Sequence, residues 1–544
     1  MRDYDAAYRE FSVEALERQV LQGSLAGGLN ACVECCDRWA DEGRVALNWI
    51  GRDFSRKTVT FRQLQEGAAR FANLLHARGI GRGDTVAGLL PRIPELLVVA
   101  LGTWRAGAIY QPLFTAFGPK AIEHRVTAAG GSRAKLIVTD AANRGKLDEV
   151  PDRPPMLPVD PDPAKPGTLA AALAQQPAEF APVMLTGDDP FIIMFTSGTT
   201  GHPKGVRYKL RQLLPFVAYL LDGAGLREAD RFWNVADPGW AYGMINAVVA
   251  PLMLGHATTL YEGLFTVEAA VRIIAEQGIT NLAAAPTVYR LMMAAGRQAM
   301  APIAGQLRVA SSAGEPLNPE VARWAAEVLH CPLHDHYGQT ETAMVINNYH
   351  GLRHAVKPGS AGLQAPGFTL AILGDDLKPL PPNTPGILAI DRTRSPLLAF
   401  TGYWHGETPS LQGRWYLSGD TMQQDADGYF YFVARSDDVI TSAGYRIGPF
   451  DVESVLIEHP AVAEVAVVGK PDPERTEIVK AFVVLRKGQV ASDTLAEELQ
   501  KLVRTRLSLH AYPREIEFIG ELPKTPSGKV QRFLLRQRAG AAAA

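Results

Sequence analysis

The stretch that decides the fold is Phe191-Ile-Ile-Met-Phe-Thr-Ser-Gly-Thr-Thr-Gly-His-Pro-Lys-Gly-Val206. Its first five residues are apolar and predict a buried strand, whereas the hydroxyl- and glycine-dense residues after them cannot continue one. We therefore predict a flexible loop at the end of a strand. Backbone N–H groups, side-chain hydroxyls and one lysine charge suit a polyphosphate. The predicted phosphate-binding residues are Thr196, Ser197, Gly198, Thr199, Thr200, Gly201 and Lys204.

Two other interpretations of this loop were weighed. A plain surface turn seldom collects so many donors and a lysine behind a buried strand. The P-loop of NTPases places Ser or Thr directly after Gly-Lys, but here Pro203 precedes Lys204 and Gly205 follows it. The stretch instead closely resembles the phosphate-binding loop of the adenylate-forming superfamily, which includes acyl-CoA synthetases, luciferases and the adenylation domains of peptide synthetases.

Length and composition limit the class of protein. A chain of 544 residues is too long for one ordinary core, so two or more domains are expected. Hydrophobic residues make up 47% and charged residues 21%, which is typical of a soluble globular protein. A formal charge of -2 gives no general attraction to nucleic acid or anionic lipid. We find no secretory signal after the charged N-terminus and no apolar run long enough for a spanning helix, so a cytoplasmic enzyme is expected.

The cysteines and histidines were considered as metal ligands. The four cysteines are too few for a disulfide framework, and the C-x-x-C pair has no second pair, so we expect a buried helix there. An H-x-H motif with a preceding cysteine could suggest zinc, but a proline interrupts it and no fourth ligand is evident. The residues concerned are Cys32, Cys35, Cys36, Cys331, His334 and His336.

Strands and helices alternate along most of the chain. Thr60-Phe-Arg-Gln63 has the form of a capping box and predicts a helix that ends near Gly79. Further strands are expected at 86–90, 134–139, 191–195, 281–285 and 307–310, and helices at 94–107 and 267–277. This alternation predicts an α/β fold with a large multi-layer N-terminal domain and largely parallel sheets. The Pro-rich stretch 151–182 is interpreted as a surface excursion.

A second, smaller domain is expected at the C-terminus. Strands at 462–468 and 478–485 and a helix opened by Thr494-Leu-Ala-Glu497 form about a hundred residues of α+β structure. We predict an N-terminal ATP- and acyl-binding domain at 1–434, a hinge at 435–440 and a small mobile C-terminal domain at 441–544.

The resemblance to the adenylate-forming superfamily extends from about Asn30 to Arg536 and implies roles for further residues. The segment Ser311-Ser-Ala-Gly314-Glu315-Pro316 is similar to the family's adenine-binding segment. In Tyr337-Gly-Gln-Thr340-Glu341, the resemblance implies that Tyr337 stacks on adenine, Thr340 contacts the α-phosphate and Glu341 holds Mg²⁺. An aromatic face, a hydroxyl and a hard oxygen ligand suit those three partners.

The resemblance continues towards the C-terminus. It implies that Asp420 accepts the ribose hydroxyls and that Arg435 reaches the ribose or phosphates of the nucleotide. It further implies a hinge at Asp437 and a route for CoA past Gly444 and Arg446. Lys529, in the loop Pro523-Lys-Thr-Pro-Ser-Gly-Lys-Val530, is implied as the catalytic lysine that bridges the acid's carboxylate and the α-phosphate.

The family resemblance implies an AMP-forming acyl-CoA synthetase that uses ATP, Mg²⁺ and CoA. Acetate-specific relatives carry tryptophan where this chain has Gly338, so a pocket longer than acetate is expected, with Trp240 as another wall. The expected acid is short- or medium-chain, or aryl. The alternatives are amino-acid activation onto a carrier-protein thiol, with Asp237 holding the amino group, and a nucleotide sensor without catalysis. The oligomeric state stays open, with a homodimer as one option.

Overall fold

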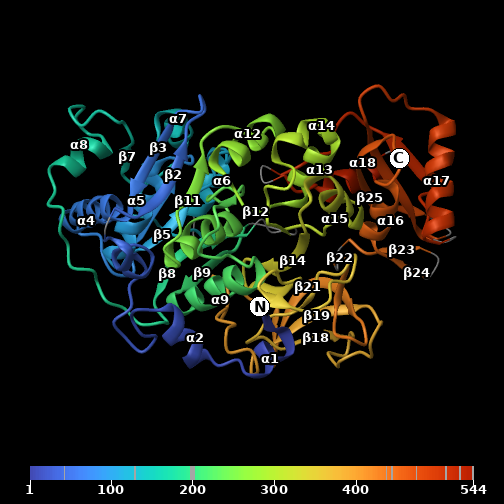
Figure 1. Ribbon diagram of the computed structural model, residues 1–544, viewed down its shortest axis with the longest axis horizontal. Helices are drawn as coiled ribbons and strands as arrows, with labels where there is room; N and C mark the ends of the chain where they lie inside the picture. The colour runs from blue at the N-terminus through green and yellow to red at the C-terminus, as the bar shows by residue number, and fades with distance from the viewer. Residues whose placement is uncertain are drawn as a thin grey trace.

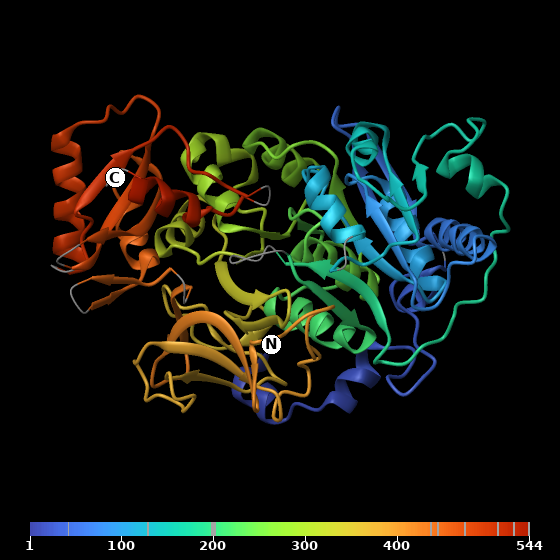
Figure 2. The ribbon, with the colours of Figure 1, turned by 180° about the vertical axis from the view of Figure 1, so that it is seen from behind.

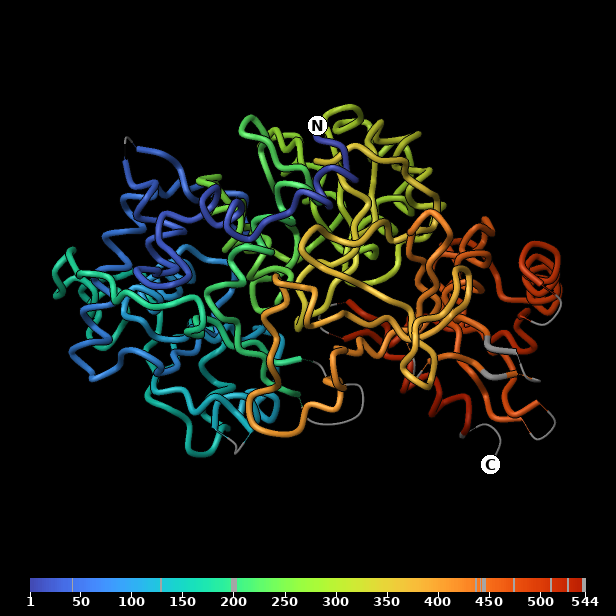
Figure 3. Tube along the Cα trace, turned by 90° about the horizontal axis from the view of Figure 1, so that it is seen from below, coloured from blue at the N-terminus to red at the C-terminus, as the bar shows by residue number. Residues whose placement is uncertain are grey.

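The computed structural model describes residues 1–41, 43–127, 130–196, 203–435, 438–442, 445–472, 475–508, 511–525 and 528–541. The molecule is elongated, with the blue strands at one end and the C-terminal domain, in orange and red, at the other (Figure 1). The view from below shows the same separation along the long axis (Figure 3). The fold is the expected α/β arrangement of a large N-terminal and a smaller C-terminal domain.

The first large sheet carries the stretch that decides the fold. Its strand order is β7-β6-β4-β5-β8-β9, parallel except for β9 at one edge. The bounds are β4 Thr85–Leu89, β5 Ile109–Pro112, β6 Leu136–Thr139, β7 Met156–Pro158, β8 Pro190–Phe195 and β9 Gly205–Lys209. Thr196 N donates to Lys204 O at 3.0 Å, so the predicted phosphate loop closes a β8–β9 hairpin.

Helices pack beside this sheet as the sequence predicts. Helix α4, Phe61–Ala77, begins at the expected capping box, in which the side chains of Thr60 and Gln63 each accept from the other's backbone N–H. The other helices of this region are α3 Ala31–Cys35, α5 Pro94–Arg105, α6 Pro119–Val126, α7 Ala141–Asp148 and α8 Leu169–Ala174. Cys32, Cys35 and Cys36 are buried in the core, as expected for a structural helix.

The second large sheet supplies the centre of the candidate site. Its order is β10-β12-β13-β14-β15-β17, parallel through β14 and antiparallel beyond. The bounds are β10 Phe232–Asn234, β12 Asn281–Ala284, β13 Val309–Ala313, β14 Leu333–Gln339, β15 Ala343–Asn347 and β17 Leu363–Gln364. The strand expected at 307–310 in fact runs to Ala313, because Ser311 and Ser312 are buried and pair with β12 and β14. Gly314 is therefore the first residue after the strand.

Helices and irregular turns accompany this second sheet. Three of these elements, η3, η4 and η6, are π-helical. Their bounds are η2 Leu210–Gln212, α9 Leu213–Ala218, η3 Tyr219–Gly223, α10 Ala241–Gly243, η4 Met244–Val249, α11 Ala250–Met253, α12 Val267–Gln277, α13 Pro286–Ala295, α14 Arg297–Met300, η5 Ala301–Ile303, α15 Pro319–Trp324 and η6 Ala325–Leu329. The predicted helix at 267–277 is α12.

Two smaller sheets, of three and five strands, also belong to the N-terminal domain. One pairs β2 Val45–Ile50 with β3 Arg56–Thr60 and β11 Thr258–Tyr261, and the other joins β18 Leu370–Leu373, β19 Gly386–Asp391, β20 Leu411–Gln412, β21 Trp415–Gln424 and β22 Phe430–Arg435. The N-terminal segment, with β1 Arg2–Asp3, α1 Tyr4–Arg9, α2 Val13–Val20 and η1 Asp37–Trp39, returns to pair with β16 Leu352–Arg353. Seen from behind, α1 lies beside the strands of the orange sheet (Figure 2).

The C-terminal domain has its own sheet and core. The strands are β23 Ile440–Ser442, β24 Tyr445–Ile447, β25 Val462–Asp472, β26 Thr476–Leu485 and β27 Glu515–Phe518, and the helices are α16 Pro449–Leu456, α17 Asp493–Arg506 and α18 Arg532–Ala541. The capping box predicted at Thr494–Glu497 is wrong: Ser492 caps α17, with its Oγ accepting from Leu495 N at 3.2 Å. Among the residues described, no helix is both long and apolar enough to cross a membrane.

Candidate active site

Segments that are far apart in the sequence converge beside the β14–β15 turn. Tyr208 of β9 donates its hydroxyl hydrogen to the backbone oxygen of Thr340 at 2.7 Å. The Lys204 ammonium lies 4.9 Å from the centre of the Tyr403 ring, and the Tyr403 hydroxyl donates to Glu341 Oε1 at 2.8 Å. The base of the predicted phosphate loop and the segment 337–341 therefore share one site.

Asp420 connects that segment to β21. Its Oδ2 accepts from the Tyr337 hydroxyl at 2.6 Å and from Gln339 Nε2 at 2.8 Å. The Tyr416 hydroxyl in turn donates to Gln339 Oε1 at 2.8 Å. Asp420 lies directly opposite Arg435 in the β21–β22 pair, and its Oδ1 is 3.9 Å from Arg435 Nη1. One oxygen of this carboxylate is thus engaged twice, and the other faces a cation.

Burial and nearby positive charges shift the pKa of Asp420 in opposite directions. Only 5% of the residue is exposed, and this burial raises the pKa of its carboxyl above the usual value. The positive charges of Arg435 and Lys529 lower this pKa. The hydrogen bonds from Tyr337 and Gln339 lower it as well. The residue predicted to hold the ribose therefore lies within electrostatic reach of the predicted catalytic lysine.

Lys529 of the C-terminal domain is brought to the end of β13. Its Cε is 3.9 Å from the position that a Cβ on Gly314 would occupy. The loop backbone is fixed locally, because Lys529 N donates to Thr525 Oγ1 at 3.1 Å and Thr525 N donates to Lys529 O at 2.7 Å. Asn318 Nδ2 also donates to Ser454 Oγ at 3.0 Å, which joins the two domains near this point.

Glu341 has the surroundings of a metal ligand. The residue is 9% exposed, and burial raises the pKa of its carboxyl, while the hydrogen bond from Tyr403 lowers it. Magnesium is usually bound by one or two carboxylates together with substrate phosphates. A single oriented carboxylate beside the base of a phosphate loop fits that donor set.

The predicted adenine segment begins at a glycine with positive φ. Gly314 has φ +99°, a conformation that favours glycine. Glu315 does not point freely into the site, because its Oε2 pairs with Arg290 Nη2 at 2.9 Å. Pro316 follows Glu315 in the turn that leads to α15.

Asp335 is a residue that the sequence reasoning missed. Its Oδ2 accepts from Leu317 N at 3.1 Å, whereas its buried Oδ1 has no hydrogen-bond partner among the residues described. Burial raises the pKa of this carboxyl to about 8. Asp335 pairs with Ser312 in the sheet and lies two residues before Tyr337. The adjoining Asp335-His336-Tyr337 run was visible in the sequence, but nothing in it showed which atom would lack a partner.

Trp240 and Asp237 lie in the loop before α10. The Trp240 ring packs on Phe114 and Phe117, with ring centres 5.2 and 5.5 Å apart respectively. Asp237 Oδ1 accepts from Gly239 N at 2.8 Å, and its Oδ2 is 3.6 Å from Arg92 Nε. Since the carboxylate already faces an arginine, an added ammonium would meet a like charge there.

Gly338 lies where two strands come close together. Gly338 lies at a bulge between β14 and β15. A Cβ at this position would approach the backbone oxygen of Ala343 too closely and would lie 2.7 Å from Met344 Cα. The glycine therefore permits close approach of two backbones, and its part in the acyl pocket stays a prediction.

The histidines of the H-x-H motif have hydrogen-bonding roles. His336 Nδ1 lies 2.9 Å from the Tyr219 hydroxyl and its Nε2 lies 3.0 Å from Asn348 O. His334 stacks on His350, with ring centres 3.9 Å apart, and contacts the same Asn348 oxygen at 3.0 Å. Burial lowers the pKa of all three imidazoles, which keeps them neutral near pH 7.

Some predicted residues lie outside the described part of the chain. These are Ser197, Gly198, Thr199, Thr200 and Gly201 of the phosphate loop, Asp437 of the hinge, and Gly444 of the CoA route. The backbone of Arg446 pairs with Thr441 in β23–β24. The roles predicted for these residues stay predictions.

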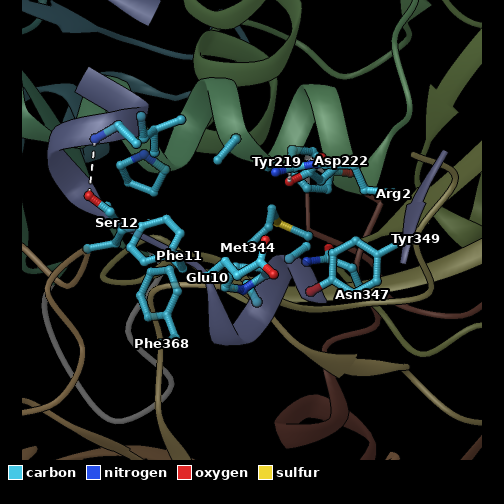
Figure 4. Close-up of a pocket in the computed structure, with 18 of the residues that line it drawn as sticks. Arg2, Glu10, Phe11, Ser12, Tyr219, Asp222, Met344, Asn347, Tyr349 and Phe368 are labelled. Atoms are coloured by element: carbon cyan, nitrogen blue, oxygen red, sulfur yellow. Dashed lines mark hydrogen bonds and ion pairs between the residues drawn. The ribbon is translucent and has the colours of Figure 1, made fainter. Parts of the chain in front are cut away.

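A cavity of about 100 Å³ lies elsewhere, between the N-terminal helices, α9 with η3, and β15. Figure 4 shows Phe11 and Phe368 on one side of it and Tyr219 and Asp222 on the other. None of the residues predicted to bind ATP, Mg²⁺ or the acid lines this cavity. It is a feature separate from the candidate site.

Comparison with known proteins agrees with this arrangement. Residues 36–404 match the family described as AMP-binding enzyme, and residues 451–529 match the AMP-binding enzyme C-terminal domain. The acetyl-coenzyme A synthetase of Bacillus subtilis (strain 168) is 38% identical over 98% of this chain and 95% of its own. A Brucella canis acyl-CoA synthetase structure is 54% identical, covers 100% of both chains and has a TM-score of 0.81. The anthranilate CoA ligase AuaEII, solved with anthranoyl-AMP, is 27% identical over 95% of this chain and 98% of its own, with a TM-score of 0.85.

The chain belongs to the AMP-binding enzyme family. The family expected from the sequence is thereby confirmed, as is the expected two-domain α/β fold. Within the family, the predicted class of enzyme, an AMP-forming acid–thiol ligase of the acyl-CoA synthetase type, is confirmed as well.

Proposed function

We propose that this enzyme converts a short- or medium-chain, or aryl, carboxylic acid to its CoA thioester through an acyl-adenylate, using the site described above. One observation carries the proposal: Lys529 of the C-terminal domain approaches Gly314, in the site where Lys204 and Glu341 also meet Tyr403. Simple capture of a nucleotide requires neither a lysine from a second domain nor a buried carboxylate beside the phosphate loop. These features therefore favour catalysis over a nucleotide sensor.

ATP would lie beside the base of the phosphate loop, the 314–316 turn and the segment 337–341. Adenine packs against Tyr337 and the 314–316 turn. The ribose lies at Asp420 and Arg435, where the carboxylate and the cation suit hydroxyl groups and phosphate respectively. The Thr196–Lys204 loop and Thr340 bind the phosphates.

In the first half-reaction, a carboxylate oxygen of the acid forms a bond to the α-phosphorus of ATP. The bond from that phosphorus to the bridging oxygen breaks, and pyrophosphate leaves with both electrons. Lys529 bridges the acid's carboxylate and the α-phosphate, and Lys204 neutralises charge on the leaving group. Mg²⁺, held by Glu341 when bound, would supply further neutralisation of phosphate charge.

In the second half-reaction, the CoA sulfur forms a bond to the acyl carbon and the bond from that carbon to AMP breaks. The thiol proton leaves with solvent, since no general base is evident among the described residues near the site. We predict that the small domain rotates about Asp437 between the steps, withdraws Lys529 and presents Gly444 and Arg446 to CoA.

The proposed class of acid substrate rests on the relatives and on the surroundings of Trp240. The relatives named above include an acetyl-coenzyme A synthetase and an anthranilate CoA ligase, so the range from short aliphatic to aryl acids is the range to test. Trp240, packed on Phe114 and Phe117, is proposed as an apolar wall. The Arg92–Asp237 pair disfavours an α-ammonium group, which counts against the alternative of amino-acid activation.

A panel of acids tests this proposal. Acetate through octanoate, benzoate and several amino acids would each be assayed for ATP-dependent pyrophosphate release and for CoA-thioester formation. We expect both products with fatty or aryl acids. Hydroxamate formation with amino acids alone would instead favour adenylation for a carrier-protein thiol. A cytoplasmic location and a homodimer stay predictions, the latter testable by light scattering.

A further inference from the structure

Tyr403 is a site residue to which neither the sequence motifs nor the family resemblance assigned a role. It lies in the connection between β19 and β20, after Gly402, whose φ of +137° favours glycine. Its backbone N–H donates to Thr408 Oγ1 at 3.0 Å, and its ring packs edge-on against Phe400 at 5.1 Å. These contacts fix the direction in which the side chain points.

The next residue anchors the same segment to the phosphate loop. Trp404 N donates to Gly205 O at 2.7 Å, directly after Lys204. The indole N–H of Trp404 donates to Gly131 O at 3.2 Å. The segment 402–404 therefore bridges the first large sheet and the sheet of β18 to β22, which leaves Tyr403 little freedom to move relative to the loop base.

Tyr403 makes two contacts that concern different parts of a bound MgATP. Its hydroxyl donates to Glu341 Oε1 at 2.8 Å, so this oxygen is occupied and the orientation of the carboxylate is set. Its ring lies beneath the Lys204 ammonium at 4.9 Å, a cation–π contact that holds the lysine at the loop base.

We propose that Tyr403 is a positioning residue that orients Glu341 for Mg²⁺ through its hydroxyl and holds Lys204 for the phosphates through its ring. The proposal rests on the proposed function, because it takes Glu341 as the metal ligand and Lys204 as the phosphate cation. The hydroxyl and the ring of Tyr403 thus have separate roles. Removing the hydroxyl alone affects the metal, and removing the ring affects the phosphates as well.

Two variants divide these tasks. Tyr403→Phe removes the hydroxyl and keeps the ring, whereas Tyr403→Leu removes both. Tyr8→Phe is the matched control, because the Tyr8 hydroxyl also makes one partly buried hydrogen bond, to Phe368 O at 2.9 Å, far from the site. Thermal unfolding would verify that all variants fold.

The readout is binding without turnover. Mn²⁺ affinity would be measured by electron paramagnetic resonance with an ATP analogue that carries a methylene group between the α- and β-phosphorus, and affinity for the same analogue would be measured without metal. Loss of a residue that orients a metal ligand typically weakens metal binding about 10–100-fold. We expect a loss of about 10-fold for Tyr403→Phe with metal-free nucleotide affinity unchanged. For Tyr403→Leu we expect the same metal defect and about 2–5-fold weaker metal-free nucleotide binding.

The outcomes separate this proposal from the proposed function. If Tyr403→Phe bound Mn²⁺ as tightly as the wild type and the Tyr8→Phe control, the positioning role would be refuted. Equal losses of metal-free nucleotide affinity in the Phe and Leu variants would also refute it, since the ring would then have no task of its own. If the wild-type protein itself bound neither the analogue nor its metal complex, the proposed function would fail instead.

Discussion

Substitution of Gly338 tests whether this glycine lets two backbones pack closely or leaves space for the acid. A Cβ at residue 338 would meet the backbone of Ala343 and Met344, with Met344 Cα at 2.7 Å. Because backbone atoms cannot rotate away as a side chain can, the β14–β15 hairpin would have to separate. Overpacking typically costs about 1–3 kcal/mol, and a contact of this kind should lie at the upper end.

Gly338→Ala is therefore expected to destabilise the protein by about 3 kcal/mol, which corresponds to a fall in Tm of roughly 3 °C for a domain of this size. Pyrophosphate release should fall too, because the hairpin carries Tyr337, Thr340 and Glu341. Differential scanning fluorimetry and the pyrophosphate assay would be run beside Gly81→Ala, since a Cβ at residue 81 meets nothing within 4 Å. A Gly338→Trp protein of wild-type Tm that prefers acetate would refute the reasoning and restore the pocket role.

Two further predictions follow from the buried carboxylates. Burial raises the pKa of Asp335 to about 8, above the 3.8 of an unfolded aspartate, so the folded state binds the proton more tightly and its stability falls as pH rises from about 4 to 8. Asp335→Asn removes this penalty, so its free energy of unfolding relative to wild type should rise between pH 5 and pH 7 by up to roughly 1.4 kcal/mol per pH unit, which would be followed as a growing difference in Tm. A difference in Tm independent of pH would contradict burial of the charge as the cause. Glu341→Gln keeps an acceptor for Tyr403 but loses the charge, so pyrophosphate release should need about 10-fold more Mg²⁺. An unchanged Mg²⁺ titration curve would remove Glu341 as the metal ligand.

Local sequence signals predicted the elements that lie near one another in the chain. The capping box at Thr60 and the apolar run at 191 each correspond to the observed helix and strand. The wrong helix cap arose because Ser492 and Thr494 are both good cap residues two positions apart, and only the tertiary structure selects Ser492.

The contacts that hold the site together could not be read from the sequence. Tyr403 is 62 residues from Glu341, and the Gln339–Asp420 hydrogen bond spans 81 residues. Gly338 shows a different limit: a glycine in a motif is compatible both with an open pocket and with close backbone packing, and only the position of β15 decides. Burial at Asp335 is likewise a property of the packed sheet and not of the tripeptide around it.

The most direct test of the account separates the two half-reactions in Lys529→Ala. In the proposed mechanism, Lys529 lies at the α-phosphate during adenylation and away from it during thioester formation. The variant should therefore lose acid-dependent pyrophosphate release by at least about 100-fold, while it still converts a supplied acyl-adenylate and CoA to the thioester. Pyrophosphate release at the wild-type rate in Lys529→Ala would contradict the central claim that the C-terminal domain completes this active site.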